Sequence, residues 1–465
     1  MRRALHGHAS SVLVAALSSA FGVLLLEVTG LLGQLIAGDD VTGSSHTVTT
    51  LLQALAIVFI VIAVYVGAIV TSNTFATIIA GRTRTIALMR LIGSSAADQR
   101  KAVAKEGLLV GVIGSLTGAV VASLIAWLGL AIGLATKFIQ SHDYHVLDSA
   151  IVLPIVAVVL TTWLASWIGS RRVLHVSPME ATGAAVERTI DETRSLRGRR
   201  ASAAVLFFVG LGLLVLGILA GLVTPLGVLI GVVGGIVSFS GVVLGAQFVM
   251  PVALRLVGRI FGRSATARLA AENAVRYPER SARSTIGLVI GVALVTMFAV
   301  AVQSFQVMIH AAQASQPEVY QGTDAVLNVI VVIFSVLMGF SALIAAVGMV
   351  NALSLSVLQR TRELGLLRAL GFTARQVRTM VLAESAQLTI AAVVVGLVLG
   401  TFYGWAGAQS LLGSLNGLPG IVVPAIPVVL LIGVVVAAAV LIAVASVAPA
   451  RRATSVAPVA ALAVE

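Results

Sequence analysis

Apolar runs long enough to cross a lipid bilayer recur along the whole chain, and they constrain its fold more than any other feature. A hydrocarbon core of about 30 Å needs about 20 apolar residues of helix. Because lipid offers the backbone no hydrogen-bond partners, such runs form helices rather than open sheet. The runs lie near residues 11–36, 51–78, 104–135, 150–170, 203–222, 227–250, 284–306, 325–352, 379–410 and 425–448. The sequence therefore predicts an all-α polytopic membrane protein of about ten transmembrane helices.

Composition supports this class and excludes others. The chain is 59% hydrophobic and 10% charged, with a mean hydropathy of +1.08, too apolar for a soluble protein of 465 residues. It has no cysteine, which excludes disulfides, thiolate metal sites and cysteine nucleophiles. The first run follows Arg2 and Arg3 as in a signal peptide, but no clear small-residue cleavage signal interrupts it. We interpret it as a retained first helix.

The basic residues orient the expected helices. Of the 30 Lys and Arg residues, only Lys137 lies in a connection on the side opposite the two termini. Cytoplasmic loops are the ones enriched in Lys and Arg, so the chain is expected in a bacterial cytoplasmic membrane with both termini inside. The net charge of +12 is then interpreted as a topology signal rather than as a nucleic-acid surface.

An internal repeat divides the chain. At an offset of 278 residues, polar and glycine positions in the first half coincide with identical residues in the second; the pairs are Asn73 and Asn351, Arg82 and Arg360, Arg84 and Arg362, Arg90 and Arg368, Gly93 and Gly371, Arg100 and Arg378, and Glu106 and Glu384. The predicted organisation is a first four-helix repeat (1–175), a cytoplasmic linker (176–202), a two-helix insert (203–262) and a second four-helix repeat (263–465). An even number of spans per unit gives parallel repeats about an axis normal to the membrane.

Each repeat carries an amphipathic, arginine-rimmed segment between its second and third spans. In the second, Leu364, Leu366, Leu367 and Leu370 interleave with charged residues, Gly371 is expected to end a helix, and Thr373 to cap the next one. One interpretation is a docking site for a soluble partner; the other is an interfacial helix that only anchors the membrane edge. Its presence in both halves favours a partner with two-fold symmetry.

The second of these segments resembles a known family. The run Arg362-Glu363-Leu364-Gly365-Leu366-Leu367-Arg368-Ala369-Leu370-Gly371, followed by Glu384, is similar to the signature of FtsX-like permeases, as are the ending around Arg451-Arg452 and the stretch 269–276. The resemblance extends over about 263–465 and, more loosely, over 50–185, where Thr85 replaces Glu363. Two fused units resemble the ten-span BceB-like branch, although the large extracytoplasmic domains of that branch are absent from this sequence.

The resemblance implies a MacB-type ABC system in which a separate ATPase drives the permease. ATP and magnesium would then be bound by two copies of a partner ATPase, and this chain would hold no cofactor, metal or catalytic residue. The absence of a G-x-x-x-x-G-K-[S/T] run agrees with this. The residues that the resemblance assigns to ATPase coupling are Arg82, Arg84, Arg90, Gly93, Arg360, Arg362, Glu363, Arg368 and Gly371.

Three carboxylates lie within or beside the apolar runs. Glu106 and Glu384 follow the arginine-rimmed segments and are interpreted as supports that hold those segments to the next span, favoured by the helix dipole. Glu27 lies deep in the first span, where an ionisable group is expensive. It either touches substrate or a gate, or it reaches the interface or pairs with a polar neighbour. The outer loop 141–148 is interpreted as a polar surface rather than a metal site.

The sequence leaves three functions open. The first is an exporter permease that extrudes a hydrophobic or amphipathic substrate, such as a lipid or a drug, since the outer loops are too short for protein cargo. The second is a signalling or regulatory subunit that transmits ATPase strokes without moving cargo. The third is an ion-coupled secondary transporter, which parallel repeats allow but which usually shows broken helices and paired midplane charges.

Overall fold

A computed structural model describes most of the expected spans. It describes residues 9–37, 57–72 in part, 87–89, 92–136, 144, 149–170, 197–259, 272–317 in part, isolated positions between 331 and 343, 370–414, and 420–440 in part. Within these residues the regular structure is helical, without a strand, which confirms the all-α class.

The described helices are mostly long. They are α2 (Ala9–Ala37), α5 (Ala96–Ala135), α6 (Val152–Gly169), α8 (Arg197–Gly221), α9 (Gly227–Gly258), α11 (Pro278–Ser315) and α14 (Ala374–Leu412), and a 3₁₀ turn, η1 (Ser149–Ile151), leads directly into α6. All seven of these α-helices are long and apolar enough to cross a membrane. They correspond to seven of the expected spans. The runs 51–78, 325–352 and 425–448 lie largely outside the described residues, but positions described within each are helical.

Helices α5 and α14 begin earlier than the apolar runs suggest. The runs predict starts at residues 104 and 379, whereas the helices start at Ala96 and Ala374. The difference has a physical reason: hydropathy marks only the section of a helix that lies in lipid, and a capped helix continues through polar sequence beyond it.

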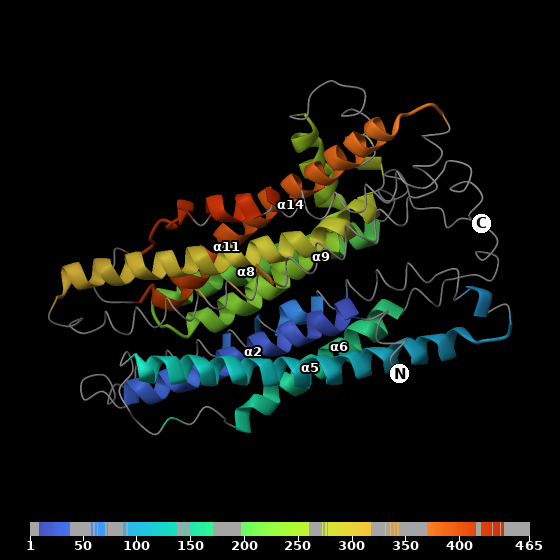
Figure 1. The fold of residues 1–465 in the computed structure, drawn as a ribbon. Helices are drawn as coiled ribbons and strands as arrows, with labels where there is room; N and C mark the ends of the chain where they lie inside the picture. The colour runs from blue at the N-terminus through green and yellow to red at the C-terminus, as the bar shows by residue number, and fades with distance from the viewer. Residues whose placement is uncertain are drawn as a thin grey trace.

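The helices form two groups, one from each half of the chain (Figure 1). In the first, α2 packs on α5, and α6 packs on α5 and α2. In the second, α11 packs on α14, and the hairpin of α8 and α9 lies against both of them. The pair α2 and α5 is thus matched by the pair α11 and α14, whereas the insert helices associate with the second half.

Glycine allows the helices of each group to approach closely. Gly396, Gly400 and Gly404 of α14 lie against backbone or side-chain atoms of α11, with no room for a Cβ atom. In α5, Gly114 and Gly118 lie equally close to α2, and Gly107 and Gly111 face α6. Small residues at this spacing are the usual means of close helix packing in lipid, as the sequence predicted.

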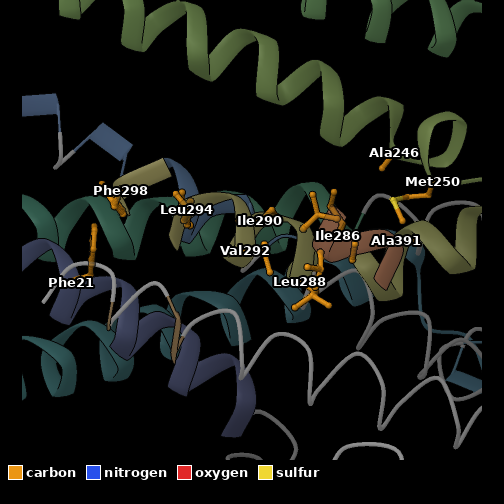
Figure 2. Close-up of a cluster of buried hydrophobic side chains, with 14 of the residues drawn as sticks. Phe21, Ala246, Met250, Ile286, Leu288, Ile290, Val292, Leu294, Phe298 and Ala391 are labelled. Carbon is orange, nitrogen blue, oxygen red and sulfur yellow. The ribbon is translucent and has the colours of Figure 1, made fainter. Parts of the chain in front are cut away.

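One large apolar core joins the two groups. Phe21 of α2 faces Phe298 of α11, with ring centroids 6.3 Å apart. Figure 2 shows this pair at one end of the cluster and Met250 of α9 near Ile286 of α11 and Ala391 of α14 at the other. The central helix of this core is α11: the membrane-spanning window of α11 is 83% buried within the protein.

Candidate functional site

A sharp turn precedes α5 in the first repeat. Gly93 has a φ of +99°, a conformation that residues with a Cβ rarely adopt. The backbone N–H of Ser94 donates to the carbonyl of Met89 at 3.0 Å, which closes the preceding turn. The Ser95 hydroxyl then accepts from the backbone N–H of Asp98 at 3.1 Å and caps α5. The chain therefore reverses at Gly93 and begins a long helix three residues later.

The second repeat builds the same turn 278 residues later. Gly371 also has a φ of +99°. The Thr373 hydroxyl accepts from the backbone N–H of Gln376 at 3.2 Å, and the Gln376 side chain accepts from the backbone N–H of Thr373 at 2.8 Å, which completes a capping box. The expected helix end at Gly371 and the expected cap at Thr373 are confirmed. The residues of this turn and of the turn at Gly93 are called the entry turns below.

The first ten residues of α5 and α14 are polar and lie before the apolar section of each helix. In α5, the guanidinium carbon of Arg100 lies 3.8 Å from the ring centroid of Trp167 at the end of α6. A cation over a tryptophan face is attracted by the ring quadrupole. This contact ties the polar end of α5 to the neighbouring helix, and sequence reasoning missed it because the two residues are 67 positions apart.

Glu106 and Glu384 occupy the same position in their helices, ten residues after Ala96 and Ala374. The dipole effect falls off within the first turn, so it does not account for these carboxylates as the sequence analysis supposed. Glu384 is only 3% exposed, and Glu106 is partly buried. Both lie at the boundary between the polar and apolar sections of their helices, where they can contact neighbouring helices.

The charged residues expected at the coupling segments lie outside the described part of the chain. These are Arg82, Arg84, Arg90, Arg360, Arg362, Glu363 and Arg368. Of the coupling residues, the structure describes Gly93 and Gly371, which it places in the two entry turns. The loop 141–148 and both Asn73 and Asn351 also fall outside, apart from Tyr144.

Glu27 lies inside the first group of helices. It is 2% exposed and its Oε1 accepts a hydrogen bond from the Ser123 hydroxyl of α5 at 2.5 Å. Its Oε2 is buried and has no hydrogen-bond partner among the described atoms. Of the two interpretations of Glu27, pairing with a polar neighbour agrees with this geometry, and a contact with substrate stays a prediction.

A cavity of about 150 Å³ lies within the second group of helices. Its walls come from the described part of the second span, α8, α9, α11 and α14; the aromatic residues among them are Tyr65, Phe239, Phe298, Phe305 and Tyr403. The Tyr403 hydroxyl lies 2.8 Å from that of Ser238, and the Tyr65 hydroxyl 2.8 Å from that of Ser240. Sequence reasoning missed this site, although tyrosine and serine within apolar runs are a usable signal of interhelical hydrogen bonds.

Comparison with known proteins supports the resemblance on which the sequence analysis drew. Over 119 residues the chain is 32% identical to a protein of Bacillus subtilis (strain 168) described as "Uncharacterized ABC transporter permease YknZ". The alignment covers 26% of this chain and 27% of that relative, so the chain matches about a quarter of its length.

A protein family described as "FtsX-like permease C-terminal" matches the chain twice, over residues 57–178 and 335–458. The two matches begin 278 residues apart, the same offset as the internal repeat, and together they cover just over half of the chain. Each includes one entry turn and most of the helix that follows it. The chain is therefore a multi-pass membrane protein that belongs to the FtsX-like permease family.

Proposed function

We propose that this chain is the permease subunit of an ABC exporter, in which a separate ATPase drives extrusion of a hydrophobic or amphipathic substrate. The observation that carries the proposal is the pair of matching entry turns, each leading without a break into a helix of 40 (α5) or 39 (α14) residues. The permease family and the name of the relative support the ABC assignment.

The length of α5 and α14 suits the transmission of force. At 1.5 Å per residue each helix is about 60 Å long, roughly twice the thickness of the hydrocarbon core. The polar first ten residues therefore project about 15 Å from the membrane on the side where the helices begin. A partner that moves the two entry turns would move two rigid rods, each packed through glycine against the first helix of its own repeat.

In this mechanism the ATPase binds on the cytoplasmic side, in two copies that engage the two entry turns. ATP and magnesium belong to those partner chains, while the coupling residues of this chain supply charge complementarity and positioning. Closure of the ATPases would rock the groups α2–α5–α6 and α11–α14 relative to each other. Since the two groups meet through side chains such as Phe21 and Phe298, such a motion needs no helix to break.

The docking assignment is tested by co-purification of the full chain with an ATPase encoded beside it. We expect Arg82, Arg84 and Arg90 changed together to Ala, or Arg360, Arg362 and Arg368 changed together to Ala, to remove most of the bound ATPase. The matched control replaces Arg197, Arg199 and Arg200, three exposed arginines at the start of α8, and removes the same charge. Complex formation that survives both triple changes but not the control would refute the assignment.

Transport and signalling are separated by reconstitution. With both ATPases bound, ATP should drive release of a fluorescent amphipathic probe from proteoliposomes, and the Gly371→Val variant should abolish this release. A complex that hydrolyses ATP under control of the permease but moves no probe would favour the regulatory alternative. Movement driven by an ion gradient without any ATPase would favour a secondary transporter.

A further inference from the structure

We infer that the cavity beside α8 and α9 is a binding site for the hydrocarbon part of a ligand, an acyl segment or an aromatic ring. This inference deepens the proposed function by naming the chemistry that the permease recognises within the membrane. It also assigns a role to the two-helix insert, which the repeat and the entry turns leave unexplained.

The insert supplies a large part of the cavity wall. Val228, Gly231, Val232 and Gly235 of α9 face it, and Leu214 of α8 completes that side. The opposite wall is formed by α11 and α14, and the second span contributes Tyr65 and its neighbours. Because the described helices of the first group contribute no wall, the site is asymmetric between the two repeats.

The lining offers a ligand apolar contacts rather than hydrogen bonds. The hydroxyls of Tyr65 and Tyr403 are already engaged with Ser240 and Ser238, and the Ser410 hydroxyl donates to the carbonyl of Gly407. The remaining described wall is aliphatic and aromatic carbon together with glycine. A void of this kind stays dry and leaves its lining atoms without contact partners, so a hydrocarbon group gains dispersion energy by entering it.

The volume limits what can enter. An engineered apolar cavity of about 150 Å³ takes benzene, and the cavity described here has about the same volume. It can therefore hold one ring or a short stretch of acyl chain, but not a charged headgroup. Any headgroup would have to remain outside the cavity.

Helix α14 connects this cavity with an entry turn. Tyr403, Gly407 and Leu411 line the cavity near one end of α14, and Thr373 caps its other end. Tyr403 lies 29 residues after Ala374, about 44 Å along an uninterrupted helix. A displacement at the entry turn is thus carried to the cavity wall by a single rigid element.

The test fills the cavity without disturbing the packing around it. A Cβ atom at Gly235 or at Gly407 meets nothing within 4 Å, although both residues line the cavity. Gly235→Leu therefore projects a side chain into the void from α9, and Gly407→Leu does so from α14. The matched control is Gly212→Leu, at an exposed position of α8 that also has open space and does not line the cavity.

The purified full chain is placed in nanodiscs without any ATPase and photolabelled with two probes. One is a phosphatidylcholine with a diazirine in its acyl chain; the other is a free aryl diazirine. We expect labelling of peptides that line the cavity, and we expect both filled variants to reduce it at least about tenfold, as a loss of 1.4 kcal/mol in binding would. The Gly212→Leu variant should label like the unmodified protein.

The outcomes separate the sources and the hypotheses. Labelling by the lipid probe identifies bilayer acyl chains as the occupant, and labelling by the aryl probe alone identifies a free apolar compound. Cavity labelling that is undiminished in both filled variants, provided that they unfold at the same temperature as the control, would overturn the inference. Because no ATPase is present, that result would leave the proposed coupling at the entry turns standing.

Discussion

The two halves of this protein agree at the ends where α5 and α14 begin and differ inside the membrane. Both have a glycine with a φ of +99°, a capped helix start and a carboxylate ten residues further on. Only the second half carries α8 and α9, and for this reason the spanning window of α14 is 56% buried, against 39% for α5. The shared part is suited to a symmetric partner, and the unshared part to an asymmetric ligand.

The interior polar groups follow the same division. In the first half, Glu27 of α2 and Ser123 of α5 form a buried pair. In the second half, Tyr403 of α14 pairs instead with Ser238 of the insert, and the Gln387 side chain donates to the carbonyl of Leu254 of α9 at 2.9 Å. The repeat thus preserved the entry turns while each half acquired its own contacts within the bilayer.

The largest expected effect concerns packing that the halves share. We predict that Gly118→Val and Gly400→Val each destabilise the protein by about 3 kcal/mol, the upper end of the usual cost of overpacking. In both cases a Cβ atom would collide with a backbone carbonyl of the facing helix, Ala16 or Ala293 respectively. Thermal unfolding of the purified variants measures this effect.

The controls for this prediction are Gly129→Val in α5 and Gly407→Val in α14, where a Cβ atom has open space. Since valine is a better helix former than glycine, these variants should be no less stable than the unmodified protein. A large loss for Gly400→Val with none for Gly118→Val would show that the two helix pairs are not equivalent.

An intermediate effect is expected at the entry turns. A side chain at a φ of +99° is strained, so Gly93→Val and Gly371→Val should each cost about 1–3 kcal/mol locally. We expect both to lower the ATP hydrolysis of the partner in the complex, with the greater loss at Gly371, because Thr85 replaces the glutamate that Glu363 supplies there. Asparagine tolerates positive φ better, so the corresponding Asn variants should retain more activity. Equal losses would contradict the functional asymmetry.

The smallest effect concerns the pair found only in the first half. We predict a coupling free energy of about 1 kcal/mol between Glu27 and Ser123, in the range measured for hydrogen bonds between membrane helices. A double-mutant cycle of Glu27→Ala and Ser123→Ala, followed by unfolding in detergent, gives this value. If Glu27→Gln retains stability but loses transport, the carboxylate has a role beyond packing, and the structural interpretation is wrong.

Much of the architecture could be predicted because its causes are local. The lengths of the apolar runs indicated the helices in the described region, and the glycine at position 371 with Thr373 after it indicated a helix end followed by a cap. The glycines at positions 396, 400 and 404 indicated a closely packed helix face. Each of these depends on residues within a few turns of one another.

Other features could not be predicted from the same patterns. Arg100 and Trp167, Glu27 and Ser123, and Ser238 and Tyr403 are separated by 67, 96 and 165 positions respectively. Hydropathy also placed the starts of α5 and α14 too late, because the polar turns that extend these helices lie outside the lipid.

The sequence by itself determined that the chain is a helical membrane protein with two parallel repeats, since backbone hydrogen bonding in lipid leaves no other fold for such runs. Only the tertiary structure decided which half the insert joins and that a cavity remains there. The reason is that every apolar helix face is acceptable to lipid, so hydrophobicity does not select a partner helix. Shape selects it, through the glycine contacts of α8 and α9 and the side chains of α14.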